Sequence, residues 1–219
     1  MNRAASFLNN YSLPILIGSS LLMQLLGRYH AHYYAMGHFY YSWVFLRIII
    51  PLIIIKSLRI PFSEMGLRPP KNNRFLIFLG AVSLLGLLAI YFLIHASPQY
   101  LGYYAKGWGA LDGRRLMNFM VFTLSTLTGW EFLHRSFLLM GIVYILEKRH
   151  RVEKSLAHQT AILIVWTFEV LFHFIKPQME ATGMLLGSPV LSYITLKTGS
   201  IWPAFLIHLG VEIVFILSF

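Results

Sequence analysis

The stretch from residue 75 to residue 95 reads FLIFLGAVSLLGLLAIYFLIH and contains no Lys, Arg, Asp or Glu. A helix needs about 20 predominantly apolar residues to cross the hydrocarbon core of a bilayer. We therefore predict that this stretch is a membrane-spanning helix and that the chain is an integral membrane protein.

The rest of the chain has the same apolar character. Hydrophobic residues make up 57% of the 219 residues and charged residues 12%, with a mean hydropathy of +0.65, which is more apolar than an ordinary soluble domain. Further apolar runs lie near 12–28, 38–56, 116–146, 156–174, 181–197 and 201–218. The predicted fold is an all-α, polytopic transmembrane helix bundle of about seven spans.

Lys and Arg give the chain a formal charge of +10 and gather in short segments between the apolar runs. Basic segments of this kind, here within 56–74 and 148–154, stay on the cytoplasmic side of a membrane. They predict a cytoplasmic N-terminus and contacts with the headgroups of the lipid bilayer, and they argue against nucleic acid as a partner. Cysteine is absent, which excludes disulfides, thiolate metal sites and a cysteine nucleophile.

Several ionisable residues lie in or beside the apolar runs, where an unpaired charge is costly. These residues are Glu131, Arg135, Glu169, His173, Glu180, His208 and Glu212. Three pairs among them are spaced by four residues, which places both members on one face of a helix. Each pair alone has a structural explanation as a buried ion pair, and Glu180 also suits the start of a helix. Their number on neighbouring spans favours a shared polar cavity.

Such a cavity has the groups for hydrolysis. A glutamate beside an imidazole takes a proton from water and returns it to a leaving amine, and a second histidine donates to the developing oxyanion. This scheme requires no metal and no cofactor. Zinc is the main chemical alternative, because two histidines and a carboxylate form a catalytic ligand set, although His-Glu-x-x-His is absent. We interpret His30, His32 and His38 as an exposed cluster with fortuitous metal affinity.

Three motifs in order resemble those of the CAAX protease and bacteriocin-processing (CPBP, or Abi) family of glutamic-type intramembrane endopeptidases. The family's Glu-Glu-x-x-x-Arg resembles Trp130-Glu131-Phe-Leu-His-Arg135, its Phe-x-x-x-His resembles Glu169-Val-Leu-Phe-His173, and its His-x-x-x-Asn resembles His208-Leu-Gly-Val-Glu212. The resemblance covers roughly residues 116–216. Three motifs in the right order, each on a predicted span, are more specific than any one of them.

The chain departs from the family pattern at three positions. Trp130 stands where the family has its first glutamate, Glu169 replaces an aromatic residue, and Glu212 replaces an amide. The tryptophan variant is similar to a bacterial and archaeal branch of the family, in which His-x-x-Lys-Pro and a later glutamate recur, as in 173–177 and Glu180. The resemblance therefore implies a working variant in a prokaryotic cell (inner) membrane.

The resemblance implies two parts, N-terminal transmembrane helices and loops at 1–115 and a catalytic helical core at 116–219. The expected activity is hydrolysis of a peptide bond in a membrane-associated protein or peptide. Glu131 is then the base, His173 shares in activating water, and His208 binds the oxyanion. Arg135 orients Glu131, and the other three glutamates have supporting or alternative roles.

Two functions of other classes are compatible with the sequence. One is a non-catalytic membrane scaffold of the same fold, and the other is a transporter that uses the intramembrane glutamates as a proton relay. No inverted repeat relates the two halves of the sequence, which counts against the transporter.

Overall fold

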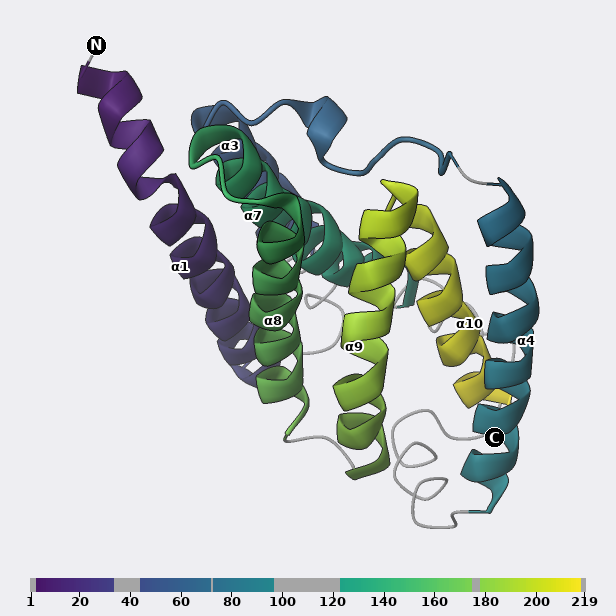
Figure 1. Cartoon of the computed structure of the whole chain (residues 1–219). Helices are drawn as coiled ribbons and strands as arrows, with labels where there is room; N and C mark the ends of the chain where they lie inside the picture. Colours follow the sequence, from purple (N-terminus) through teal and green to yellow (C-terminus); the bar gives the residue numbers. More distant parts are fainter. Residues whose placement is uncertain (1–2, 34–43, 72, 97–122, 175–177, 218–219) are drawn as a thin grey trace.

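The chain folds into an all-helical bundle (Figure 1). A computed structural model describes residues 3–33, 44–71, 73–96, 123–174 and 178–217. Within these ranges there are seven α-helices and no strand. The long helices are α1 (Arg3–Tyr33), α4 (Asn73–His95), α8 (Lys154–His173), α9 (Gln178–Thr198) and α10 (Trp202–Leu217). The all-α prediction is confirmed.

A continuous helical run from 123 to 149, here called the central helix, passes through the middle of the bundle. Its π-helical stretches are η3 (Phe132–Met140) and η4 (Ile145–Arg149), with α7 (Gly141–Tyr144) between them. α1, α8, α9 and the short α3 (Ile50–Ser57), which continues η1 (Phe45–Ile49), all contact η3. Residues 131–139 are consequently buried throughout.

The main hydrophobic core joins both halves of the sequence. It contains Leu16 of α1 and Ile55 of α3 together with Leu133 and Phe137 of the central helix and Ala161 of α8. The central helix therefore packs against the N-terminal helices and α8 within one cluster. The proposed division at residues 115 and 116 remains a prediction.

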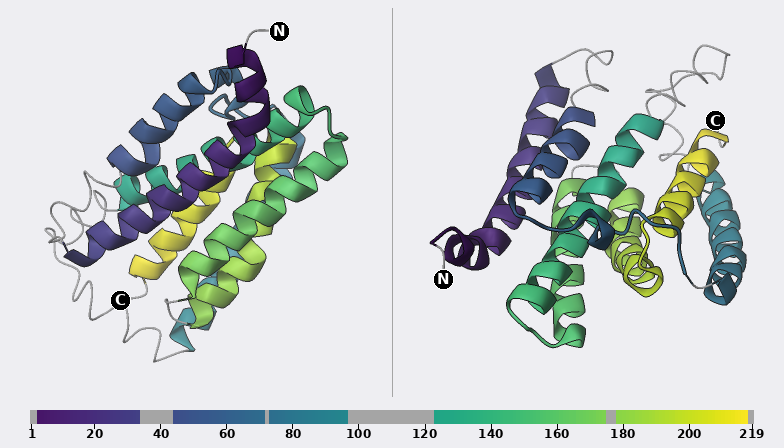
Figure 2. Two further views of the ribbon diagram at one scale, coloured as in Figure 1. Left: turned by 90° about the vertical axis from the view of Figure 1, so that its left-hand side faces the viewer. Right: turned by 90° about the horizontal axis from the view of Figure 1, so that it is seen from above.

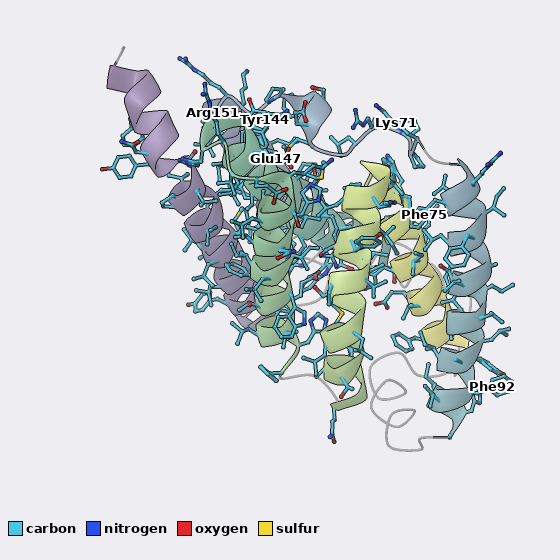
Figure 3. The ribbon with its side chains drawn as sticks, in the orientation of Figure 1. Lys71, Phe75, Phe92, Tyr144, Glu147 and Arg151 are labelled. Carbon is cyan, nitrogen blue, oxygen red and sulfur yellow. The ribbon has the colours of Figure 1, made fainter. Side chains whose placement is uncertain are left out.

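α4 lies at the edge of the bundle, beside α10 (Figure 2). Most of its large apolar side chains face outward, including Ile77 at 76% exposure and Phe92 at 67% (Figure 3). Its segment Arg74–His95 and the segment Lys154–His173 of α8 are long and apolar enough to cross a membrane. Within the described residues these two helices meet that criterion, so the number of about seven spans remains a prediction.

A short connection, η2 (Phe62–Glu64) and the residues after it, is tied to the turn between α9 and α10. The Ile201 N–H donates to the Gly66 carbonyl at 2.9 Å, and the Ser200 hydroxyl donates to the Arg68 carbonyl at 2.7 Å. Gly66 and Gly199 have φ values of 68° and 62°, a backbone region that glycine adopts without a Cβ penalty. These contacts set the position at which α10 begins.

α8 begins at a side-chain cap. The Glu153 carboxylate accepts hydrogen bonds from the backbone N–H groups of Ser155 and Leu156 at 2.9 and 3.0 Å. The two bonds hold the pKa of Glu153 below its ordinary value, because they stabilise the charged form. One face of α8, with Ala157, Ala161, Val165 and Glu169 spaced by four, then packs into the bundle.

Candidate active site

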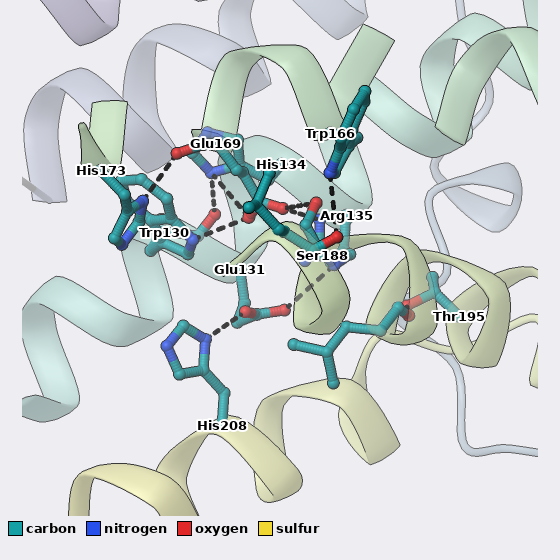
Figure 4. A network of polar contacts seen from close by, with 12 residues as sticks. Trp130, Glu131, His134, Arg135, Trp166, Glu169, His173, Ser188, Thr195 and His208 are labelled. Atoms are coloured by element: carbon teal, nitrogen blue, oxygen red, sulfur yellow. Dashed lines mark hydrogen bonds and ion pairs between the residues drawn. The ribbon is translucent and has the colours of Figure 1, made fainter. Parts of the chain in front are cut away.

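Glu131 and His208 form the contact that links the central helix to α10. The two residues are 77 positions apart, and the His208 Nδ1 lies 2.7 Å from the Glu131 Oε1 (Figure 4). We assign the proton of this contact to the imidazole Nδ1, which then donates to the carboxylate oxygen. Glu131 is 0% exposed, and the His208 side chain is 15% exposed.

Arg135 lies between two carboxylates. Its Nη1 is 2.8 Å from the Glu169 Oε2 on α8, and its Nε is 3.8 Å from the Glu131 Oε2 on the same helix. All three side chains are completely buried. The spacing of four residues predicts that Arg135 lies on the same helix face as Glu131. Packing of the helices brings Glu169 of α8 closer to Arg135 than Glu131 is.

The Glu169 carboxylate collects hydrogen bonds from two neighbouring helices. The Trp130 indole N–H of the central helix donates to its Oε1 at 2.9 Å, and the Ser188 hydroxyl of α9 donates to its Oε2. A buried carboxylate is stabilised when several donors and a cation surround it. Glu169 therefore belongs to the interior of the site rather than to its accessible part.

His134 connects this network to α1. Its Nδ1 lies 2.9 Å from the Trp130 carbonyl oxygen and its Nε2 lies 3.0 Å from the Gln24 Nε2. A carbonyl only accepts, so Nδ1 carries the proton, and Nε2 accepts from the Gln24 amide. The N-terminal half of the chain thus contributes a buried side chain to the surroundings of the site.

His173 occupies a different place from Glu131 and His208. Its Nδ1 lies 2.7 Å from the Glu169 carbonyl oxygen and its Nε2 lies 3.7 Å from the Glu180 Oε1 on α9. The imidazole stands edge-on to the Trp130 ring, with centroids 5.2 Å apart. Figure 4 shows His173 beside Trp130, while Glu131 and His208 face each other.

Glu212 forms the exposed end of the polar network. Its Oε1 lies 4.0 Å from the His208 Nε2, one helical turn away on α10, and its side chain is 35% exposed. Exposure thus rises along this chain of contacts from Glu131 through His208 to Glu212.

Arg47 lies next to the site, and sequence reasoning did not include it among the site residues. Its guanidinium is 0% exposed and stacks over the rings of Trp130 and Phe172, with its Cζ 4.8 and 5.5 Å from their centroids. The sequence feature that could have identified Arg47 is the presence of an arginine within the apolar run near 38–56. Gln24 and Ser188 are weaker signals of the same kind, because each is polar within a predicted span.

No group of three or more His, Cys, Asp or Glu side chains in the described part of the chain is arranged to hold a metal ion. The side chains of His30, His32 and His38 lie outside the described residues. The prediction of chemistry without a metal or cofactor remains a prediction.

A comparison with protein families matches residues 112–214 to the model described as type II CAAX prenyl endopeptidase Rce1-like. No curated protein and no solved structure matches the chain. The matched range contains the central helix, α8, α9 and most of α10, and with them all seven predicted site residues. Residues 112–214, a little under half of the chain, are thus an Rce1-like type II CAAX prenyl endopeptidase domain, in agreement with the CAAX protease family that the three motifs resemble.

Proposed function

We propose that this protein is an intramembrane endopeptidase that hydrolyses a peptide bond in a membrane-associated protein or peptide, with Glu131, His173 and His208 as catalytic residues. The match of residues 112–214 to this family model supports a membrane protease at the level of the family. The observation that carries the proposal is the buried 2.7 Å contact between Glu131 and His208, which joins two helices of the matched domain.

A carboxylate bonded to an imidazole is an acid–base pair. We propose that Glu131 is the base that takes a proton from water and returns it to the leaving amine, with His173 sharing in the activation of water and His208 binding the oxyanion. Arg135 keeps Glu131 in place, and Glu169 in turn keeps Arg135 in place through the 2.8 Å contact. In this proposal the pair acts as a unit, with Arg135 and Glu169 supporting it from behind.

His173 and Glu180 supply a second group of proton-carrying side chains. The 3.7 Å separation of the His173 Nε2 and the Glu180 Oε1 is longer than a direct hydrogen bond, and one water molecule bridges such a gap. The Trp130 ring stands against His173 where the family pattern has a carboxylate. We propose that His173 and Glu180 relay protons on this side of Trp130, and that the variant is active.

The location follows from the charge pattern and the tryptophan variant. We propose a prokaryotic cell membrane with the N-terminus in the cytoplasm. The basic segments within 56–74 and 148–154 support this orientation.

Substitution of Glu131 tests the proposed function. In a bilayer or detergent assay with a labelled membrane peptide, Glu131→Gln is expected to reduce turnover by about 100-fold or more, because the pair loses its carboxylate. Glu147→Gln is the matched control. Glu147 lies about four turns further along the central helix, 3.2 Å from His158 (Figure 3), and its replacement should leave turnover unchanged.

The outcomes separate the classes of function. Normal turnover by Glu131→Gln, or complete loss of turnover with a chelator, contradicts the proposal. A scaffold tolerates His173→Ala and His208→Ala and produces no new peptide terminus. A transporter that uses these glutamates as a proton relay instead moves its solute across vesicle membranes when a pH difference is applied.

A further inference from the structure

We propose that Trp166 is a positioning residue of the site, because its indole N–H holds the part of α9 that carries Glu180 against α8. The inference rests on the proposed function, in which His173 and Glu180 relay protons, and it adds what fixes their separation of 3.7 Å. Two observations lead to it, namely a proline within α9 and a hydrogen bond from an α8 side chain to the α9 backbone.

Pro189 interrupts the hydrogen bonding of α9. Proline has no backbone N–H, so Pro189 cannot donate to the carbonyl four residues earlier, which is that of Leu185. Leu185 is 41% exposed, so this part of α9 lies at the surface of the bundle. In a bilayer no water is present to pair with such a carbonyl, and a backbone group without a partner is costly there. The Leu185 carbonyl therefore needs a donor from another part of the chain.

Trp166 of α8 provides that donor. Its indole Nε1–H donates to the Leu185 carbonyl oxygen at 3.1 Å. Trp166 lies about two turns before His173 on α8, and Leu185 follows Glu180 by five residues on α9. The hydrogen bond thus joins α8 to the segment of α9 that precedes the proline, which is the segment that carries Glu180.

Ser188 makes a second contact between the two helices, directly before the proline. Its hydroxyl donates to the Glu169 Oε2, and Figure 4 shows Trp166, Glu169 and Ser188 in one network. A proline removes a hydrogen bond that resists bending, so the direction of the segment 178–185 depends on its contacts with α8. The indole hydrogen bond fixes that direction, and with it the position of Glu180.

The pair formed by His173 and Glu180 is sensitive to a small movement of α9. Its two side chains are 6% and 12% exposed, and each is supplied by a different helix. A proton moves between two groups only when each step is within hydrogen-bond reach. A displacement of about 1 Å removes a step from that reach and can slow a reaction about 100-fold. Trp166 therefore acts on the chemistry through Glu180.

The first test is a double-mutant cycle of Trp166→Phe and Pro189→Ala, assayed with the same labelled membrane peptide. Phenylalanine keeps an aromatic ring without the indole N–H, so kcat is expected to fall about 3- to 10-fold, as for the loss of one hydrogen bond, with KM unchanged. Alanine at position 189 supplies the missing backbone N–H, so in that background Trp166→Phe should change kcat by less than about twofold. An equal loss of kcat in both backgrounds overturns the inference.

A second cycle shows whether the effect passes through Glu180. The kcat of Glu180→Gln should be reduced, and adding Trp166→Phe to it should leave kcat unchanged. A purely structural role of Trp166 lowers kcat in both backgrounds. That result overturns the inference, and so does a normal kcat of Glu180→Gln.

Thr167→Val is the matched control on α8. The Thr167 hydroxyl donates to the Leu163 carbonyl of its own helix at 2.9 Å. Its loss removes a side-chain hydrogen bond next to Trp166 without touching α9, so kcat should equal that of wild type.

The outcomes stay distinct if a variant does not fold. A Trp166→Phe protein that fails to fold should fold again with Pro189→Ala, and a double variant that also fails to fold overturns the inference. If Glu131→Gln is inactive while both cycles are additive, the inference fails and the proposed function stands. Full activity of Glu131→Gln contradicts the proposed function instead.

Discussion

Glu169 shows how much one buried carboxylate organises at this site. Its oxygens receive the Arg135 guanidinium, the Trp130 indole and the Ser188 hydroxyl. All of these polar groups are removed from water, where a lost partner costs far more than at a surface. The stability of the matched domain therefore depends strongly on the charge of this side chain.

We predict that Glu169→Gln lowers the free energy of unfolding by about 3 kcal/mol, because it leaves the Arg135 charge buried with a more distant carboxylate. Ser188→Ala is the comparison, since it removes one hydroxyl donor from the same carboxylate and should cost about 1 kcal/mol. Unfolding of the purified protein in mixed micelles with increasing SDS measures both. Equal losses for the two variants contradict this account of Arg135.

At the scale of elements, the connection after η2 determines where α10 begins. The Ser200 hydroxyl donates to the Arg68 carbonyl at 2.7 Å and accepts from the Trp202 N–H at 3.3 Å. The Trp202 indole N–H in turn donates to the Leu67 carbonyl at 2.9 Å. His208 lies further along the same helix, so these contacts act on the site through the position of α10.

We predict that Ser200→Ala lowers the free energy of unfolding by about 1 to 2 kcal/mol, because it removes both the acceptor of the Trp202 N–H at the start of α10 and the tie to Arg68. Peptide turnover should fall as well, since α10 carries His208. Ser57→Ala is the matched control. Its hydroxyl bonds to the Ile53 carbonyl of its own helix on the surface, so its loss should change stability by less than about 0.5 kcal/mol. A similar small effect of Ser200→Ala contradicts the proposed role of the connection.

At the scale of the whole molecule, α4 presents an apolar surface that a membrane protein turns toward lipid. Leu85, in the middle of the helix, is 67% exposed, and only 11% of the most apolar part of α4 is buried. An exposed apolar helix surface leads to association of proteins in water, whereas in a bilayer the lipid tails cover such a surface at no cost in free energy.

We predict that Leu85→Lys impairs membrane insertion of α4 by about 3 kcal/mol, which is the difference between leucine and lysine at the centre of a span. Glycosylation sites placed on either side of α4 report the inserted fraction. Leu67→Lys, in the connection outside α4, is the control and should leave that fraction unchanged. Insertion of Leu85→Lys at the wild-type level contradicts the assignment of α4 to the bilayer.

Both halves of the chain contribute to the surroundings of the site. The Rce1-like domain covers 112–214, yet Gln24 bonds to His134 and Arg47 stacks on Trp130. Neither contact is predictable from the sequence, because a single polar residue in an apolar run does not indicate which helix it faces. Gln24 and Arg47 are brought next to the Rce1-like domain when the helices pack together.

The amino-acid pattern alone predicts that the protein is helical, that its polar groups lie within apolar helices, and which residues share a face. These are local properties, because hydropathy and a repeat of 3.6 residues depend only on neighbours along the chain. The motifs around Glu131, His173 and His208 likewise pointed to the family before any fold was known.

Which side chains meet depends on how the helices pack. Spacing places Arg135 with Glu131 and His208 with Glu212, at 3.8 and 4.0 Å, yet the shorter contacts join Arg135 to Glu169 and His208 to Glu131, at 2.8 and 2.7 Å. The physical reason is that the crossing and rotation of a helix are set by the packing of all its neighbours, which no local pattern contains.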